Sequence, residues 1–449
     1  MEIKQFYDKT LAHGSYAIVS DRMAALVDPG RDPQPYLDFA EEHKAEVVAV
    51  FETHPHADFV SSHLEFCKKH GATLYTNSRV AAEYPHQPLN DDEEVSIGSL
   101  TIRALFTPGH SPDHNSYLLF DAEGQPHAVF TGDALFVGDV GRPDLRKGAS
   151  NGSATRQDLA RQMYHSVRQV FEKLADGVIV YPAHRAGSLC GKNMGSETAS
   201  TIGQERSQNW AFSSISEKEF VDTLLENPPF IPQYFSYDVE LNRRGAPPLS
   251  DSLRTVPSFA ANQSSQASAL ATSAVVVDVR SEKEFKQGHT AGAINIQEGD
   301  KFETWLGALI APQQPFYLLA ADEAQRDRVV RRAAKIGYEP FIQAAMVAPQ
   351  GDQKRSPALD LAHFQNNTED YTIVDVRNAF ETDGDAIFAQ AVNIPLPQLP
   401  GQVAEVDSSK PVVVHCASGY RSAAGASILE AALPQTRVYD LSDAVKRFS

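Results

Sequence analysis

The chain has 449 residues, more than a single hydrophobic core usually holds, so we expect roughly two to four domains. Its hydrophobic fraction of 42% and charged fraction of 22% are typical of a globular protein. The net charge of −18 argues against nucleic acid or an anionic membrane as a partner, because both would repel an acidic protein.

We expect a cytoplasmic protein, because the first residues lack the basic start of a signal peptide and no stretch of about 18 apolar residues could span a membrane. The three cysteines, Cys67, Cys190 and Cys416, lie far apart and form no Cys-x-x-Cys pair. Neither a disulfide framework nor a zinc knuckle is therefore predicted.

Short apolar runs alternate with amphipathic stretches over roughly the first 230 residues, which predicts an α/β domain. Strands are predicted at residues 16–19, 23–27, 46–52, 73–76, 100–106, 115–120, 128–131 and 177–181. Helices are predicted at residues 33–42, 157–174 and 217–226. The proline-rich segment 227–248 is predicted to be irregular and to hold the first domain boundary.

A cluster of metal-binding residue types follows the apolar run 47–51. It reads Thr-His-Pro-His-Ala-Asp and places His54, His56 and Asp58 at alternate positions. Three later apolar runs are also followed by residues of metal-binding types, namely His110, Asp133 and His184. Because strand ends meet at one edge of a sheet, these residues together predict a metal site.

This series resembles the metallo-β-lactamase superfamily over about residues 1–229. The resemblance implies an αββα sandwich with metal between its two sheets. Members with two metals carry a histidine directly after the aspartate of the motif, whereas Phe59 stands there in this chain. His63 lies on an apolar stripe that predicts the buried face of a helix and also contains Phe59, Val60, Leu64 and Cys67. We therefore expect a single metal, with Cys67 as inert packing.

Two histidines and one carboxylate around one metal are the pattern of non-haem Fe(II) oxygenases. Within the superfamily this resembles the persulfide dioxygenases, which oxidise a thiol persulfide with O2 to sulfite and free thiol. The resemblance implies one Fe(II) per chain, bound by His54, His110 and Asp133. The remaining residues of the cluster, His56, Asp58 and His184, would then orient the ligands. The alternative is a single Zn(II) held by His54, His56 and His110 that activates water.

Two further segments sharpen this resemblance. Residues 138–144 are similar to the substrate-side loop of persulfide dioxygenases, which makes Arg142 a candidate for binding the carboxylate of a low-molecular-weight persulfide; the alternative is a surface arginine. Residues 186–194 contain Cys190 beside Lys192, and we expect stabilised thiolate character and a role in accepting or relaying sulfane sulfur. A purely structural Cys190 is the alternative.

The second half of the chain repeats itself. Residues 275–280 (Val-Val-Val-Asp-Val-Arg) return as residues 372–377 (Thr-Ile-Val-Asp-Val-Arg), and each aspartate is followed six positions later by a glutamate, Glu284 and Glu381. Two units of this length are duplicated domains, and their strand–helix alternation predicts small α/β domains with parallel sheets. The predicted boundaries are 1–249, 250–350 (the middle domain) and 356–449 (the terminal domain).

The terminal domain contains a seven-residue loop between the apolar run 411–415 and a predicted helix at 422–432. Backbone N–H groups converge in such a loop at a helix N-terminus and stabilise a thiolate at Cys416. The loop resembles the active-site loop of single-domain rhodaneses, with Cys416 as nucleophile and Arg421 as the charge that attracts sulfite or thiosulfate. The other predicted loop residues are Ser418, Gly419, Tyr420 and Ser422. A Cys-x5-Arg phosphatase is less compatible, because this spacing is too short.

Two departures accompany the rhodanese resemblance. Rhodaneses continue into a Gly-Gly pair where this chain has Leu441-Ser442-Asp443-Ala444, which we expect to perturb the support of the loop. The corresponding loop of the middle domain, residues 320–326, contains no cysteine and carries an acidic pair. We expect the middle domain to be a rhodanese fold without its nucleophile.

The fold class expected from these patterns is a multidomain α/β protein, with an αββα sandwich followed by two rhodanese-like domains. The expected function is a bifunctional sulfide-detoxifying enzyme that oxidises a thiol persulfide with O2 and passes sulfane sulfur through Cys416 to sulfite, giving thiosulfate. We also expect a homo-oligomer. Two alternatives stay open: a mono-zinc thioester hydrolase of the glyoxalase II kind fused to a sulfur carrier, and a sulfur-trafficking or sensing protein.

Overall fold

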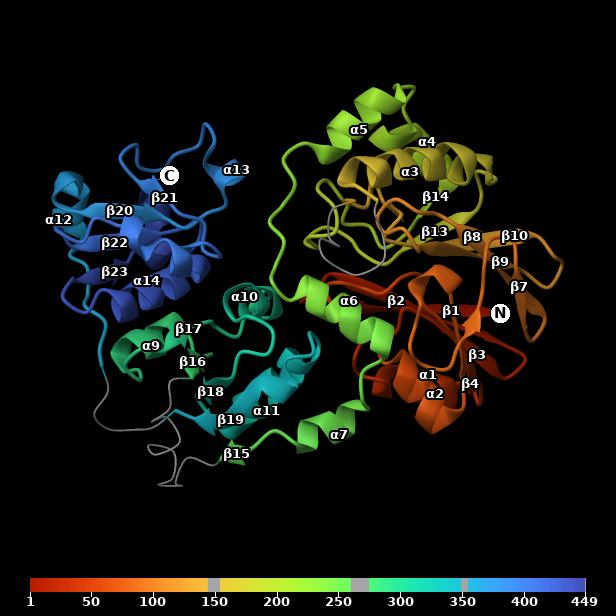
Figure 1. The fold of residues 1–449 in the computed structure, drawn as a ribbon, viewed down its shortest axis with the longest axis horizontal. Helices are drawn as coiled ribbons and strands as arrows, with labels where there is room; N and C mark the ends of the chain where they lie inside the picture. Colours follow the sequence, from red (N-terminus) through yellow and green to blue (C-terminus); the bar gives the residue numbers. More distant parts are fainter. Residues whose placement is uncertain (144–153, 260–273, 349–353, 449) are drawn as a thin grey trace. The chain divides into compact units, whose positions relative to one another are not determined.

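The computed structural model of the protein describes residues 1–143, 154–259, 274–348 and 354–448 (Figure 1). The chain divides into two compact units, one formed by residues 1–252 and 334–337 and the other by residues 253–333 and 338–449. Among the described residues, no helix has both the length and the apolar character needed to cross a bilayer.

The first unit contains two six-stranded sheets. The first sheet consists, in spatial order, of β1 (Glu2–Asp8), β2 (His13–Ser20), β3 (Met23–Val27), β4 (Glu46–Phe51), β5 (Thr73–Thr76) and β6 (Gln87–Pro88). The second consists of β14 (Ser200–Thr201), β13 (Ile179–Pro182), β10 (Pro126–Gly132), β9 (Asn115–Phe120), β8 (Leu100–Phe106) and β7 (Glu94–Ile97). A separate hairpin pairs β11 (Leu135–Phe136) with β12 (Asp139–Val140).

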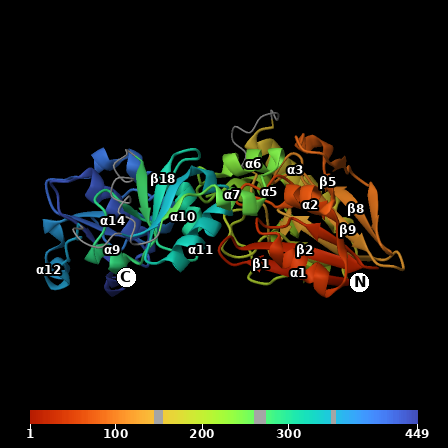
Figure 2. The same ribbon diagram turned by 90° about the horizontal axis from the view of Figure 1, so that it is seen from below.

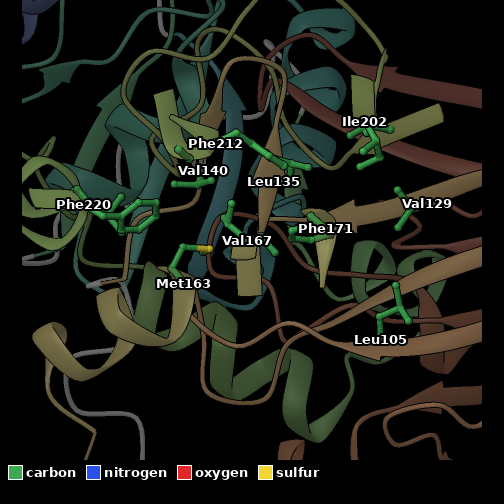
Figure 3. Packing of buried hydrophobic residues seen from close by; sticks show 14 of the residues in the cluster. Leu105, Val129, Leu135, Val140, Met163, Val167, Phe171, Ile202, Phe212 and Phe220 are labelled. Carbon is green, nitrogen blue, oxygen red and sulfur yellow. The ribbon is translucent and has the colours of Figure 1, made fainter. Parts of the chain in front are cut away.

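Three apolar layers hold these sheets together. Alternating side chains of both sheets, among them Phe51, Tyr117 and Phe130, are buried between them. The outer face of the first sheet packs on α1 (Gln34–Glu42) and α2 (His63–His70). The outer face of the second packs on α3 (Arg156–Gln169) and α5 (Glu217–Leu225), around the cluster drawn in Figure 3. The predicted αββα sandwich is therefore confirmed.

The proline-rich segment is not irregular throughout, and that expectation was wrong. It contains α6 (Phe235–Arg244), and α7 (Leu249–Arg254) follows it. The prolines flank α6 rather than interrupt it, so they limit the helix without breaking it. Asn242 in α6 donates its side-chain N–H groups to the carbonyl oxygens of His56 (2.9 Å) and Phe59 (2.7 Å). This helix therefore supports the backbone of the predicted metal motif.

The predicted helical stripe around His63 is only partly present. Phe59 and Val60 are buried, but they precede α2, which begins at His63. His63 and Leu64 are buried on that helix, whereas Cys67 is half-buried. Burial lowers the pKa of His63 to about 3, so this histidine is a neutral core residue.

The second unit contains two sheets in which all the described strand pairs are parallel. The sheet of the middle domain consists of β15 (Ser258–Phe259), β19 (Ile342–Val347), β18 (Phe316–Ala320), β16 (Val275–Asp278) and β17 (Ile294–Asn295). Its helices are α9 (Glu282–Gln287), α10 (Phe302–Leu309) and α11 (Glu323–Ala334). The sheet of the terminal domain consists of β21 (Val392–Asn393), β20 (Thr372–Asp375), β22 (Val412–His415) and β23 (Val438–Asp440). Its helices are α12 (Leu361–Asn366), α13 (Ala379–Thr382) and α14 (Tyr420–Ala432).

The repeated Asp-Val-Arg sequence forms the same buried clamp in both domains. Arg377 pairs with the Asp375 carboxylate at 2.7 Å. Asn393 donates to the carbonyl oxygens of these two residues at 3.0 and 2.9 Å. In the middle domain, the corresponding contacts join Asp278, Arg280 and Asn295. The repeat is therefore explained by a structural role that both copies need.

Candidate functional site

The six residues of the predicted metal cluster come together where strands of the two sheets end. His54, His56 and Asp58 follow β4, and His110, Asp133 and His184 follow β8, β10 and β13. All six are at most 5% exposed. Their ligand atoms form two groups that share no residue, each within 4.8 Å: His54 with His110 and Asp133, and His56 with Asp58 and His184.

Asp133 lies at the centre of this cluster. Its Oδ2 atom is 3.5 Å from His110 Nε2 and 3.9 Å from His54 Nε2, while its Oδ1 atom is 3.5 Å from His184 Nε2. Both carboxylate oxygens are buried, and neither accepts a hydrogen bond from a described residue. A buried carboxylate in that state is costly unless a cation compensates its charge. The donor set of two imidazoles and one carboxylate thus fits a divalent metal ion.

A hydrogen-bond chain sets the tautomer of His54. Thr53 Oγ1 donates to Asp28 Oδ2 at 2.9 Å, so it can only accept the proton of His54 Nδ1, which lies 3.0 Å away. His54 Nε2 then keeps its lone pair toward Asp133, as a metal ligand requires. His56 is oriented by the same carboxylate, since its Nε2 atom lies 3.1 Å from Asp28 Oδ1.

Asp28 and His114 belong to the site but were not predicted from the sequence. Asp28 directly follows β3, so the strand-end pattern that identified the other residues also applied to it. His114 lies four residues after His110, and its Nε2 atom accepts the backbone N–H of Asp133 at 3.1 Å. Thr107 Oγ1 lies 2.9 Å from His114 Nδ1 and fixes the ring. His114 thus holds the backbone on which Asp133 is carried.

The side chain that occupies the position of a second-metal histidine is apolar. Phe59 is 1% exposed, and its ring packs on the rings of His56 and His13 at centroid distances of 4.4 and 3.8 Å. Burial would raise the pKa of Asp58, but the neighbouring His184 lowers it to about 2, and their side chains lie 3.3 Å apart. The charges of Asp58 and His184 therefore compensate each other, which fits the predicted role of these residues beside one metal.

The segments of Arg142 and Cys190 are joined, because the backbone N–H of Arg142 donates to the Cys190 carbonyl oxygen at 3.0 Å. Arg142 is only 1% exposed and is not a surface arginine. Gly141, the residue before it, approaches the site so closely that a Cβ atom there would overlap the Asp133 carbonyl oxygen and lie 3.0 Å from His110 Nδ1. Residue 144, the last of the predicted substrate-side loop, lies outside the described residues.

The predicted thiolate character of Cys190 is not what its surroundings favour. Burial raises the pKa of this thiol, and the carboxylates of Asp58 and Asp133 raise it further. Lys192, expected to stabilise the thiolate, donates instead to the Thr223 carbonyl oxygen at 3.2 Å. The Cys190 sulfur does lie within 4.8 Å of ligand atoms of Asp133 and His184, so its predicted place beside the metal cluster agrees with the structure.

The Cys416 loop connects β22 to α14. Cys416 is 1% exposed, and Gly419, with a φ of 104°, donates its N–H to Cys416 Sγ at 3.1 Å. The helix begins at Tyr420, two residues before the predicted start. Ser418 is exposed, and Ser422 Oγ donates to the Gly419 carbonyl oxygen at 3.0 Å. The Tyr420 hydroxyl donates to the Gln297 carbonyl oxygen at 2.5 Å and so faces the middle domain.

Arg421 is paired within the terminal domain. Its two terminal nitrogens donate to the Glu381 carboxylate at 2.6 and 2.8 Å. Burial would raise the pKa of Glu381, but Arg421 holds it below its usual value. Trp305 of the middle domain lies near this pair, with the Arg421 guanidinium 6.0 Å from the centre of its ring. An anion that approaches Cys416 therefore meets an arginine whose charge is already balanced.

The register of the strands identifies the residue that replaces Cys416 in the middle domain. Asp375 lies opposite His415, and Asp278 lies opposite Leu319. Ala320 therefore corresponds to Cys416, and Gln325 corresponds to Arg421. This agrees with the prediction that the middle domain lacks the nucleophile.

Family models match most of the chain. Residues 10–184 match the Metallo-beta-lactamase superfamily, and residues 261–344 and 360–449 each match the Rhodanese-like domain. Among solved structures, the chain is similar to a metallo-beta-lactamase from Staphylococcus aureus subsp. aureus COL. The two are 31% identical with a TM-score of 0.70, over 78% of this chain and 99% of that one.

Curated relatives match part of the chain. The mitochondrial persulfide dioxygenase ETHE1 from Bos taurus is 27% identical over 231 residues, which cover 50% of this chain and 79% of that protein. A hydroxyacylglutathione hydrolase from Gloeobacter violaceus is 34% identical over 154 residues, which cover 34% of this chain and 54% of that protein.

Proposed function

Because the chain belongs to the metallo-β-lactamase superfamily and carries two rhodanese-like domains after its metallo-β-lactamase domain, we propose that it is a persulfide dioxygenase joined to a sulfurtransferase. The observation that carries this proposal is the group of His54, His110 and Asp133, which offers one metal two nitrogens and one carboxylate. Similarity to persulfide dioxygenase ETHE1 over half of the chain supports it.

The three ligand residues would hold one Fe(II), which supplies redox chemistry toward O2 when bound. The overall reaction is R–S–SH + O2 + H2O → R–SH + SO3²⁻ + 2 H⁺. Arg142 would bind a carboxylate of the persulfide substrate, because Gly141, the residue directly before it, lies against Asp133 and His110 of the metal cluster. His114, Thr53 and Asp28 keep the ligand residues in place, and the buried walls of the site exclude bulk water.

Cys416 would perform the second reaction. Its thiolate attacks the outer sulfur of a second persulfide, the S–S bond of R–S–SH breaks, and R–S⁻ leaves. Sulfite then attacks the outer sulfur of the Cys416 persulfide and departs as thiosulfate, and the thiol is restored. The N–H of Gly419 faces the sulfur and would stabilise its negative charge through both steps. Joining the two sites in one chain raises the effective concentration of sulfite near Cys416.

Metal analysis of protein purified without oxygen, followed by O2 consumption with a small persulfide, tests this proposal. We expect about one iron per chain. With Cys416→Ser, O2 uptake should be unchanged, and sulfite should accumulate in place of thiosulfate. Stoichiometric zinc without O2 uptake would overturn the dioxygenase assignment. Loss of O2 uptake in Cys416→Ser would overturn the division of labour between the domains.

A mono-zinc thioester hydrolase fused to a sulfur carrier is the second candidate. It is favoured by the similarity to a hydroxyacylglutathione hydrolase and by the place of His56, whose oriented ring could serve as a third nitrogen ligand. Hydrolysis of a glutathione thioester by the zinc-loaded protein would support this candidate. Its absence in protein that consumes O2 with a persulfide would exclude it.

A further inference from the structure

Ser442 lies directly behind the Cys416 loop, where the sequence departs from the rhodanese pattern. It follows β23, and its φ of 54° is left-handed, a conformation that disfavours a residue with a side chain. A Cβ atom on Gly419 would lie 3.0 Å from both the Ser442 carbonyl carbon and the Asp443 nitrogen. Because Gly419 donates its N–H to Cys416 Sγ, the backbone of Ser442 limits where that donor can lie.

The side chain of Ser442 is held across the boundary between the two rhodanese-like domains. Lys286 in α9 donates its ammonium to Ser442 Oγ at 2.7 Å and also lies 2.7 Å from Asp440 Oδ2. Asp440 Oδ2 is 2.8 Å from the same hydroxyl, and Glu282 in α9 contacts this hydroxyl as well. Both views of the fold show α9 beside α14, the helix that starts at the Cys416 loop (Figures 1 and 2).

These contacts lie where they can hold Ser442 in its left-handed conformation. The Asp440 side chain is 3% exposed and Ser442 is 7% exposed, so water competes little for the groups that Lys286 contacts, although the Lys286 side chain is itself 30% exposed. A left-handed residue other than glycine persists when its surroundings fix it, and here part of those surroundings belongs to the neighbouring domain. A glycine at position 442 would adopt the same φ without strain and would need no such support.

We propose that Lys286 of the cysteine-free domain is a positioning residue for sulfur transfer at Cys416. It fixes Ser442 in its left-handed conformation, Ser442 fixes Gly419, and the N–H of Gly419 faces the sulfur. The middle domain thereby completes the active site of the terminal domain without touching the substrate. This inference rests on the proposed sulfurtransferase function of Cys416.

Sulfur transfer from thiosulfate to cyanide by the full-length protein provides the test. In this assay Cys416 attacks the outer sulfur of thiosulfate, sulfite leaves, and cyanide removes the sulfur as thiocyanate. Lys286→Ala is measured in the natural background and in a Ser442→Gly background. We expect kcat to fall roughly tenfold in the first background, with the KM for thiosulfate changed less than about twofold, because small misplacements of a catalytic group cost rate more than binding. In the Ser442→Gly background, we expect Lys286→Ala to change kcat by less than about twofold.

If Lys286→Ala lowers kcat equally in both backgrounds, or does not lower kcat in the natural background, the proposed role of Lys286 is overturned. Lys354→Ala is the matched control, since Lys354 pairs with Glu430 in α14 at 3.0 Å and has no contact with the Cys416 loop among those of the described residues. A comparable loss of kcat in that variant would show a general effect of the interface and would also overturn the proposal.

The rate of Cys416 alkylation by iodoacetamide, followed on the Cys416 peptide, separates this inference from the proposed function. Alkylation needs no sulfur transfer. An intact protein that forms no thiocyanate contradicts the sulfurtransferase assignment. The positioning role is then judged by whether Lys286→Ala alters the alkylation rate in the natural background only; a rate altered equally in both backgrounds, or in neither, contradicts it.

Discussion

Arg421 and Glu381 form a bidentate ion pair beside Cys416, with distances of 2.6 and 2.8 Å. Arginine at this position of the loop was predicted to attract sulfite or thiosulfate, but the carboxylate balances part of that attraction. Glu381 also caps α13 by accepting from the Asn378 backbone, so the pair ties the Cys416 loop to α13.

Removing the charge of Glu381 should strengthen the binding of anionic substrates. With Glu381→Gln, we expect the KM for thiosulfate to fall by a factor on the order of 3 to 10, because Arg421 would then face the anion without a competing carboxylate. Steady-state kinetics at low ionic strength measures this. Glu405→Gln changes the net charge by the same amount on an exposed residue and should leave KM unchanged. A KM that stays constant in Glu381→Gln would show that Arg421 does not bind the substrate.

The same pair should make stability depend on pH. The pKa of Glu381 is lowered in the folded protein from an ordinary value of 4.5, so its stabilising contribution is present above that value and is lost as the pH falls through the folded value. Glu381→Gln should lower the free energy of unfolding at pH 7 by about 1 kcal/mol, and this difference should vanish as the pH falls below the lowered pKa of Glu381 in the folded protein. Urea unfolding followed by Trp305 fluorescence in a Trp210→Phe background reports on this unit. A difference that is independent of pH would contradict the ion-pair origin.

Gly141 should be essential to the metal site. Gly141→Ala would place a methyl group against the Asp133 backbone and beside His110, so these residues must move apart. We expect the variant to lose most of its bound metal and roughly 1–3 kcal/mol of stability. Metal content by elemental analysis and thermal unfolding measure the two effects. Gly177→Ala, where no atom lies within 4 Å of the added Cβ, is the control and should retain its metal. Normal metal content in Gly141→Ala would contradict the close approach.

Restoring a cysteine to the middle domain should not restore activity there. Ala320→Cys in a Cys416→Ser background should give no thiosulfate-dependent turnover, because the loop lacks more than its nucleophile. Glu323 occupies the position of Gly419 and begins α11, and Gln325 replaces Arg421. A negative charge in the loop disfavours a thiolate and an anionic substrate. Thiocyanate formation by this double variant would show that the thiol alone is sufficient.

The sequence predicted most of what depends on local pattern. Strands such as β3, β5, β8 and β9 were predicted with their observed bounds, since alternating apolar residues between turns specify them directly. The six residues of the metal cluster were found because each follows such a strand. The helix α6 was missed because nearby prolines outweighed its weak apolar periodicity.

Contacts between distant segments were not accessible to the same reasoning. His114 supports Asp133 through the backbone, and no spacing rule in the sequence indicates that contact. The neutral state of Cys190 follows from burial beside Asp58 and Asp133, which only the folded chain brings near it. In the sequence, the neighbouring glycines and Lys192 suggested a stabilised thiolate at Cys190.

The clamp of aspartate, arginine and asparagine lies beneath both rhodanese loops, whether or not the loop carries a cysteine. Its residues and those that handle sulfur do not overlap, so the scaffold can be inherited while the chemistry is gained or lost. A match to the scaffold residues alone therefore cannot distinguish a rhodanese-like domain that has its nucleophile from one that lacks it. In a chain with several such domains, the count of active centres has to be taken from the loops.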